Sequence, residues 1–332
     1  MLIVGVLAAV LSTVINPTLI VLMFMEITDG LSAYPGSRIT RKGAYLPICI
    51  SATYGSLFTS ISSTTLVVTS SLIAESSIGR PLAFQEPMIV GIPCMLVYLV
   101  IFATFGQELE RRCFDFPDIP AGLETSDKME KPQISRRKQR RTLLVLAVCI
   151  GFFIFSDFSL GAVSLAGSVV LVVTGCISAE KAVHGVKWQT VLLVACCLGF
   201  AKGVDVSGAG LLIANSAIHL FGAQITSSPV FLCVLALVIG SLLSNAMNNS
   251  SAAAVLVPIF ITIAEQTGVS PLPVAMATGA GAMLATSTPI CAPVFSIATS
   301  AGYRFKDYVR VGGLLNVLSI LACTLSLYIV YL

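Results

Sequence analysis

The sequence predicts an all-α polytopic membrane protein, built from inverted repeats with two re-entrant hairpins and broken transmembrane helices. Three observations predict this fold class: an apolar composition, seven long apolar runs, and two matched pairs of polar interruptions. The chain has 332 residues, of which 56% are hydrophobic and 11% charged, and its mean hydropathy is +0.94. Because a soluble domain carries about 25% charged residues, the composition excludes a soluble enzyme, a secreted disulfide scaffold and a nucleic-acid binder.

The apolar runs are long enough to form membrane helices, which need about 20 apolar residues each. We expect such helices within residues 44–72, 88–105, 143–158, 162–178, 188–202, 272–297 and 311–332. Two further apolar stretches, 2–25 and 230–263, carry several Ser, Thr and Asn residues at their centres. Non-helical backbone survives at membrane depth only where protein or a water-filled cavity satisfies its polar groups. Each stretch is therefore predicted to be a re-entrant hairpin, two short helices that meet at a polar tip.

Charge is concentrated in one polar segment, residues 107–142, which holds 16 of the 35 charged residues and ends in a basic cluster. Lys and Arg are enriched in the cytoplasmic loops of membrane proteins, so this segment is predicted to be a cytoplasmic linker. The basic loops 28–42, 179–187 and 301–310 then fall on the same side only if both hairpins return to the side from which they enter. The charge pattern thus supports the prediction of hairpins. The basic cluster could also contact anionic lipid headgroups.

The linker divides the chain into two halves. Residues 1–106 are predicted to be a first, incomplete inverted repeat with a hairpin and two membrane helices. Residues 143–332 are predicted to be the second repeat, with three helices, a hairpin and two helices.

The two halves share a pattern of polar residues. The tip LSTVINPT at 11–18 precedes a helix with a hydroxyl-rich centre at 59–65, and the tip LSNAMNNS at 243–250 precedes a helix centred on 286–289. Because one hairpin enters from each side, the repeats are inverted, which is typical of secondary transporters with a site near the midplane. Ser and Thr in membrane helices also bond their own backbone, but four clusters in two matched pairs favour binding.

Hydroxyl and amide groups can bind both a small cation and an oxyanion. Their oxygens replace the hydration shell of a small cation, while amide N–H groups and helix N-termini hold an oxyanion. The predicted substrate- and ion-binding residues are Ser12, Asn16, Thr18, Thr59, Ser62, Ser63, Thr64, Thr65, Asn245, Asn248, Asn249, Ser250, Thr286, Ser287 and Thr288. Asn16, Ser62, Asn248 and Thr288 are the candidate sodium ligands among them. We expect no catalytic residue, no cofactor and no metal beyond sodium, since nine of ten cysteines lie in apolar runs and only two histidines are present.

Two motifs carry a family resemblance. Asn248-Asn249-Ser250 is followed by small and aliphatic residues ending at Pro258, and the segment GYRFKD at 302–307 is followed by Val311-Gly312 and Asn316. In these motifs the chain resembles the divalent-anion:sodium symporters of the ion-transporter superfamily, the sulfate and di/tricarboxylate permeases. The resemblance implies alternating access, a small inorganic or carboxylate anion as substrate, sodium as coupling ion, and a homodimer.

The chain departs from the family pattern at three places. Pro17 stands where the first tip of the family has its central Asn, and neither broken helix carries the family's Asn. Family members have further membrane helices ahead of the first hairpin, so an N-terminally truncated chain is expected.

The leading interpretation is a secondary active transporter that binds sulfate or a di/tricarboxylate at these tips. Its transport is expected to be coupled to sodium. Two alternatives stay open: a cation/proton or metalloid antiporter of the same superfamily, and a truncated, non-transporting membrane relative. An intramembrane serine enzyme is disfavoured, because His184 and His219 are the only histidines that a serine nucleophile would have as its base. The expected partners are the lipid bilayer and the small anion, with no nucleic acid.

Overall fold

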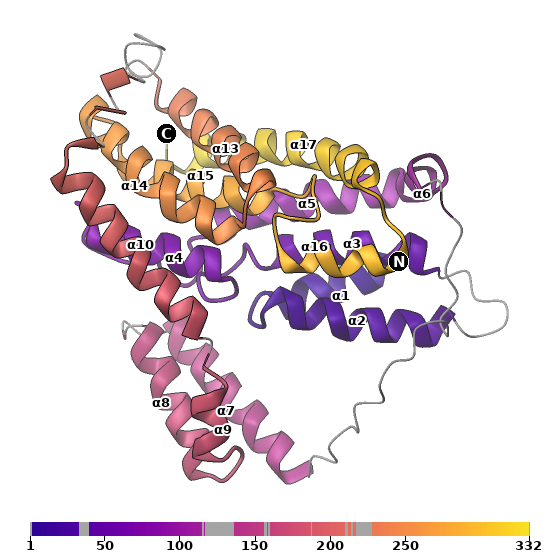
Figure 1. The fold of residues 1–332 in the computed structure, drawn as a ribbon. Helices are drawn as coiled ribbons and strands as arrows, with labels where there is room; N and C mark the ends of the chain where they lie inside the picture. Colours follow the sequence, from indigo (N-terminus) through magenta and orange to yellow (C-terminus); the bar gives the residue numbers. More distant parts are fainter. Residues whose placement is uncertain are drawn as a thin grey trace. The chain divides into compact units, whose positions relative to one another are not determined.

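The computed structural model describes residues 2–32, 40–114, 116, 136–155, 158, 160–186, 188–209, 212–213, 215–216 and 228–331. Regular structure in this part of the chain is helical (Figure 1). The chain divides into two compact units, one made of Met1–Leu123 with Leu193–Leu332, the other of Glu124–Leu192. The all-α polytopic fold class is confirmed.

The first half of the larger unit contains a hairpin, a broken helix and a closing helix. In order these are α1 (Leu2–Ser12), α2 (Pro17–Ser32), α3 (Arg41–Gly55), α4 (Thr64–Glu75), α5 (Met88–Thr104) and α6 (Gly106–Cys113). The predicted run 44–72 is thus split, and we call the non-helical residues 56–63 between α3 and α4 break 1. Break 1 coincides with the hydroxyl-rich centre that the sequence singles out.

The second half repeats the same order of elements. It contains α13 (Pro229–Ala246), α14 (Asn249–Thr267), α15 (Pro271–Leu284), α16 (Pro293–Ala298), the 3₁₀ turn η1 (Thr299–Ala301) and α17 (Phe305–Tyr331). Residues 285–292 between α15 and α16 form break 2. Both predicted helix pairs, α1–α2 and α13–α14, and both predicted interruptions of the long helices are therefore present. The arms of the second pair are longer than the short helices expected there, with 18 residues in α13 and 19 in α14.

Glycines set the same close packing in each half. Gly55 on α3 faces the backbone of Ala9 on α1, and Gly281 on α15 faces Leu237 on α13, where an added Cβ would lie 2.6 Å from the Leu237 carbonyl oxygen. In each half the first hairpin arm therefore packs directly on the first part of the broken helix. Small residues allow such close approach of membrane helices.

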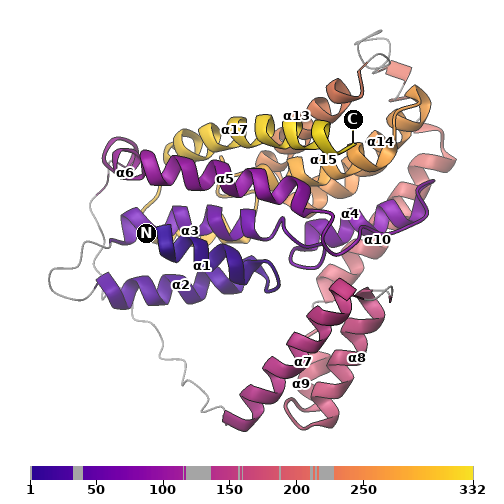
Figure 2. The same cartoon turned by 180° about the vertical axis from the view of Figure 1, so that it is seen from behind.

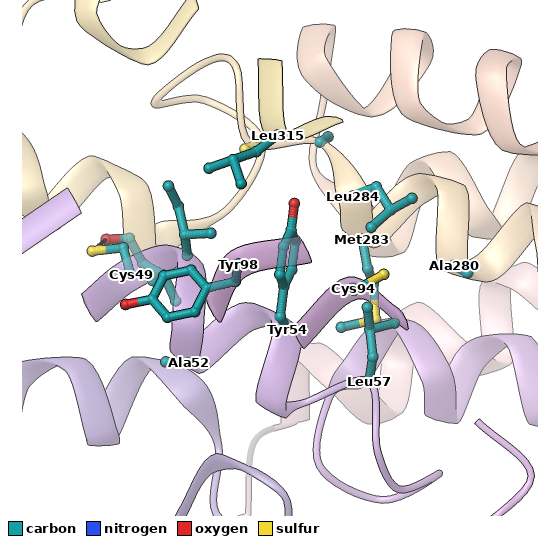
Figure 3. Packing of buried hydrophobic residues seen from close by; sticks show 14 of the residues in the cluster. Cys49, Ala52, Tyr54, Leu57, Cys94, Tyr98, Ala280, Met283, Leu284 and Leu315 are labelled. Atoms are coloured by element: carbon teal, nitrogen blue, oxygen red, sulfur yellow. Dashed lines mark hydrogen bonds between the residues drawn. The ribbon is translucent and has the colours of Figure 1, made fainter. Parts of the chain in front are cut away.

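The closing helices α5 and α17 lie side by side (Figures 1 and 2). Gly91 on α5 packs against the Leu57 carbonyl at the start of break 1, and Gly312 on α17 packs against Thr286 at the start of break 2. Between the two helices, the Cys94 and Cys323 sulfurs are 3.2 Å apart and both residues are buried. The core around them combines residues of α3, α5, α15 and α17 (Figure 3).

Length and apolar character allow three of the described helices to cross a membrane: α13, α14 and α17. Large apolar side chains are exposed along many helices, for example Leu242 on α13 and Leu321 on α17 at 67% and 62%. Exposed apolar surface of this extent suits lipid as the surrounding solvent.

The smaller unit holds α7 (Arg136–Phe155), α8 (Leu160–Val173) and α9 (Ala179–His184), while α10 (Trp188–Val206) continues into the larger unit. The segment predicted as a linker, 107–142, contributes its ends to α6 and α7. Residues 117–135 of that segment lie outside the described residues.

Candidate substrate and ion site

Asn249 bonds the tip of the second hairpin to break 2. Asn248 caps α14, with its Oδ1 accepting from the Ser250 N–H at 3.0 Å. The Asn249 N–H donates to the Cys291 carbonyl at 3.0 Å. With its amide nitrogen turned inward, the Asn249 side chain donates to the same carbonyl and to Ser244 Oγ, each at 2.7 Å. The tip is thereby fixed against the unwound backbone of break 2.

Asn245 makes a second set of bonds between the same two segments. Its Oδ1 accepts from the Ser287 N–H at 3.1 Å, and its carbonyl accepts from Thr288 Oγ1 at 2.7 Å. Ser287 is half-buried and Thr288 is buried. Both polar clusters predicted for the second half therefore meet in one place.

The tip of the first hairpin meets break 1 through fewer bonds. Asn16 caps α2 as Asn248 caps α14, its Oδ1 accepting from the Thr18 N–H at 3.0 Å. Thr59 Oγ1 donates to the Thr13 carbonyl, and Ser12 Oγ donates to the Ala52 carbonyl at 2.7 Å. Pro17 is the first residue of α2, a position at which proline is favoured because the missing N–H has no helical partner.

Break 1 contains several buried hydroxyl groups. Ser62 Oγ donates to the Ser56 and Thr59 carbonyls, and Ser63 caps α4 by accepting from the Leu66 N–H at 3.2 Å. Ser60 is 2% exposed, and its hydroxyl oxygen has no hydrogen-bond partner among the residues that the structure describes. A buried, unsatisfied hydroxyl costs about 1–3 kcal/mol, so this oxygen is suited to a bound ion.

The two halves meet between α4 and α14. Thr65 Oγ1 lies 3.1 Å from Ser250 Oγ, and Ser63 Oγ lies 3.2 Å from the Met283 sulfur on α15. Thr65 and Ser250 stand in the first turns of their helices, so two helix N-termini from opposite repeats come together here. Each N-terminus carries about half a positive charge.

The structure places the predicted residues in three groups. Those that join the tips, the breaks and the contact between the halves are Ser12, Asn16, Thr18, Thr59, Ser62, Ser63, Thr65, Asn245, Asn248, Asn249, Ser250, Ser287 and Thr288. Thr64 is half-buried in the first turn of α4. Thr286 points elsewhere, donating to the Gly312 carbonyl at 3.1 Å and so fastening break 2 to α17.

Sequence reasoning missed Ser60, Ser244 and the Cys291 carbonyl as members of the site. Ser60 and Ser244 lie within the polar interruptions, so their residue type and place were available as a signal. The role of the Cys291 carbonyl had no such signal, because every residue has a carbonyl group.

The sequence profile described as CitMHS, citrate transporter, matches residues 1–256. This match covers more than three quarters of the 332 residues. The chain belongs to the citrate transporter family. This is a family of membrane transporters, and the predicted place of the chain in the ion-transporter superfamily is confirmed.

Individual relatives agree with this citrate transporter family assignment. The sodium-dependent dicarboxylate transporter SdcS of Staphylococcus aureus (strain bovine RF122 / ET3-1) is 26% identical over 316 residues, covering 87% of this chain and 58% of SdcS. The uncharacterized transporter YfbS of Escherichia coli (strain K12) is 26% identical over 153 residues, covering 46% of this chain and 25% of YfbS. The chain thus spans less than two thirds of the length of either relative.

A solved structure shares the fold. It is the YdaH transporter of Alcanivorax borkumensis, described as having an unusual topology. Its TM-score to this chain is 0.62, and the two sequences are 15% identical. The similarity covers 99% of this chain and 77% of that chain.

Proposed function

We propose that this protein carries a small dicarboxylate or tricarboxylate across a membrane, coupled to sodium, by alternating access. The observation that carries the proposal is the contact of Thr65 with Ser250, which joins the N-termini of α4 and α14 from opposite repeats. An oxyanion is stabilised at such helix ends by backbone N–H groups and by the helix dipole. The sodium-dependent dicarboxylate transport named for the similar SdcS supports a carboxylate as the substrate.

Charge balance supports the coupling to sodium. The tips and breaks, residues 12–18, 56–65, 244–251 and 285–292, contain no Asp, Glu, Lys or Arg. Two helix N-termini supply about one positive charge together, whereas a dicarboxylate carries two negative charges. At least one co-bound cation is therefore needed to hold a dianion away from water.

The oxygen groups suit that cation. Break 1 presents the buried Ser60 hydroxyl together with Ser62 and Thr59, and we propose a sodium site there near Asn16. The matched segment of the second half offers Thr288 and Asn248, for which we propose a second sodium site. Asn248 is exposed and Thr288 is buried, so an ion held there would enter from the tip.

The orientation follows from the charge pattern. We propose that residues 107–142 face the cytoplasm, with the first hairpin entering from that side and the second from the other. The family resemblance also supports assembly as a homodimer, with residues 1–106 and 143–332 as the two repeats.

The test is uptake into proteoliposomes that contain the native polypeptide. We expect labelled succinate or citrate to accumulate above its outside concentration when an inward sodium gradient is imposed, and not when choline replaces sodium. Labelled sulfate, measured in parallel, distinguishes an inorganic from a carboxylate substrate. Uptake of the carboxylates that is equal in choline and sodium would refute the coupling, and accumulation of sulfate alone would refute the substrate class.

A further inference from the structure

An apolar groove of about 470 Å³ runs between α7 and α8 in the smaller unit. Leu144, Val148 and Phe152 line it from α7, and Ala162 and Ala166 from α8. Three of the five α8 residues that line it are Ala or Gly, namely Ala162, Ala166 and Gly167. Gly167 of α8 packs closely on α7 here, since an added Cβ would lie 2.5 Å from the Cys149 sulfur.

A basic cluster occupies the start of α7 and ends three residues before Leu144, the first groove residue of that helix. The first six residues of α7 include Arg136, Arg137, Lys138, Arg140 and Arg141, all of them exposed. The structure ties this end of α7 to the turn that follows α8, since the Arg141 guanidinium donates to the Thr174 carbonyl at 3.2 Å.

Sequence spacing connects the groove to the cluster. Leu144 lies three residues after Arg141, and Val170, which lines the groove from α8, lies four residues before Thr174. Residues three or four apart on a helix are neighbours on one face. Both walls of the groove therefore lead directly to the bond between Arg141 and Thr174.

The charges of the cluster lack a counter-charge among the described residues. Helix α7 has no acidic residue in its first turn, and the two ion pairs of the described part join Arg41 to Asp29 and Arg80 to Glu86. A helix N-terminus is itself the positive end of the dipole, so five cations there repel one another and the helix end. A phosphate group would relieve this repulsion through charge-assisted bonds to guanidinium groups.

The helical period sorts the cluster into two faces. At 3.6 residues per turn, Arg137, Lys138 and Arg141 fall on the face that carries Leu144 and Val148 into the groove. Arg136 falls on the opposite side of α7, whereas Arg140, four residues before Leu144, lies at the edge of the groove face.

We propose that the α7–α8 groove and the basic cluster together bind one anionic phospholipid. Its acyl chain would occupy the groove, and its phosphate would lie among Arg137, Lys138 and Arg141. The two features point to the same ligand for independent reasons: the groove selects a hydrocarbon chain, and the cluster selects a negative headgroup. A free phosphate would use only the cluster, and an uncharged amphiphile only the groove.

The experiment is native mass spectrometry of the full chain in detergent, titrated with phosphatidylglycerol, phosphatidylcholine or inorganic phosphate. We expect phosphatidylglycerol to bind more tightly than phosphatidylcholine and inorganic phosphate to compete poorly. One cation near an anionic lipid contributes about a fivefold change in affinity. The double variant Arg137→Gln with Arg141→Gln should therefore weaken phosphatidylglycerol binding roughly 25-fold.

Matched variants separate the proposal from a general charge effect. Arg136→Gln removes one charge from the opposite face and should retain most of the affinity, whereas Arg141→Gln removes one charge beside the groove and should weaken binding about fivefold. Ala166→Leu, which fills the groove, should weaken binding of both lipids, whereas Ser168→Leu on the opposite side of α8 should not. Size-exclusion profiles identify any variant that has lost its fold.

Three results would overturn the proposal. Equal binding of the two phospholipids would remove the headgroup specificity. An equal loss in Arg136→Gln and Arg141→Gln would indicate diffuse electrostatics in place of a site. A dimer that Ala166→Leu dissociates, with lipid preference unchanged, would assign the groove to a second copy of the chain.

Discussion

The hydroxyl oxygens of Thr65 and Ser250 lie 3.1 Å apart, although 185 residues separate them in the sequence. One residue opens the second part of a broken helix, and the other opens the second arm of the opposite hairpin. Their contact brings two helix N-termini from different repeats to one point. The proposed anion site depends on this contact more than on any single side chain.

Removing either hydroxyl is expected to weaken substrate binding. Thr65→Val keeps the shape of the side chain and Ser250→Ala removes one oxygen, and each loses a hydrogen bond of about 1 kcal/mol, or 1.5–3 if it extends to a charged carboxylate. We expect KM for uptake to rise about 5- to 160-fold. Ser71→Ala is the control, because Ser71 lies farther along α4 and bonds only the Val67 carbonyl among the bonds described. An unchanged KM in both variants would contradict the site.

The two hairpin tips are expected to respond differently to proline. Asn249→Pro removes the backbone and side-chain bonds to the Cys291 carbonyl and leaves a buried acceptor, which costs about 1–3 kcal/mol for the carbonyl alone. Pro17→Asn in the first tip should be tolerated, because α2 begins there and Asn16 already caps it. Thermal unfolding in detergent measures both effects. Equal losses of Tm from the two changes would show that the tips are not distinguished by their bonds.

The close helix contacts at Gly55 and Gly281 are expected to resist even a methyl group. Gly55→Ala and Gly281→Ala each place a Cβ against the backbone of the neighbouring hairpin arm, and such overpacking costs about 1–3 kcal/mol. Gly30→Ala is the matched control, since an added Cβ there meets nothing within 4 Å and alanine favours the helix by about 0.5–1 kcal/mol. The Tm should fall for the first two variants and hold or rise for the third. A fall for Gly30→Ala of similar size would count against packing as the cause.

The two ion pairs are expected to contribute unequally. Arg41 binds Asp29 through Nε at 2.6 Å and Nη2 at 2.5 Å, Tyr45 donates to the same carboxylate at 2.7 Å, and the Arg41 side chain is only 12% exposed. Arg80 is 49% exposed, and its pair with Glu86 raises its pKa, so it stays charged at any pH used for assay. Exposed pairs contribute about 0–1 kcal/mol.

Arg41→Gln should therefore lower the free energy of unfolding by about 1–3 kcal/mol, and Arg80→Gln by less than about 1 kcal/mol. Denaturant titration at low and high salt measures both. Only the Arg80 effect should vanish in high salt, because screening acts mainly on exposed charges. If the Arg41 effect vanished as well, the partly buried bidentate pair would not be holding α2 to α3.

Proline 17 shows how far a motif alone could be interpreted. By its pattern it marks a departure in the first tip, and the structure places it where a helix tolerates proline best. The departure remains real in another respect, because Pro17 offers no amide to break 1 where Asn249 offers one to break 2. Pro17 thus suits the local start of α2 while it leaves break 1 without an amide N–H from this position.

Composition and residue pattern were enough to predict a membrane environment, the helices and their interruptions. Apolar composition excludes water as the surroundings, and run length and polar insertions are local properties that decide where a helix forms or stops. Hence both hairpins and both breaks, with their Ser, Thr and Asn residues, were predictable from 12–18, 56–65, 244–251 and 285–292.

Which of these polar groups meet could not be predicted, because it depends on how the helices pack. Asn249 donates to the Cys291 carbonyl, and Thr65 contacts Ser250. Thr286, with a similar polar side chain, instead donates to the Gly312 carbonyl. These choices depend on how closely the helices approach one another at Gly55, Gly281 and Gly312. The reason is physical: helix formation follows from neighbouring residues, whereas a binding site follows from packing between residues far apart in the chain.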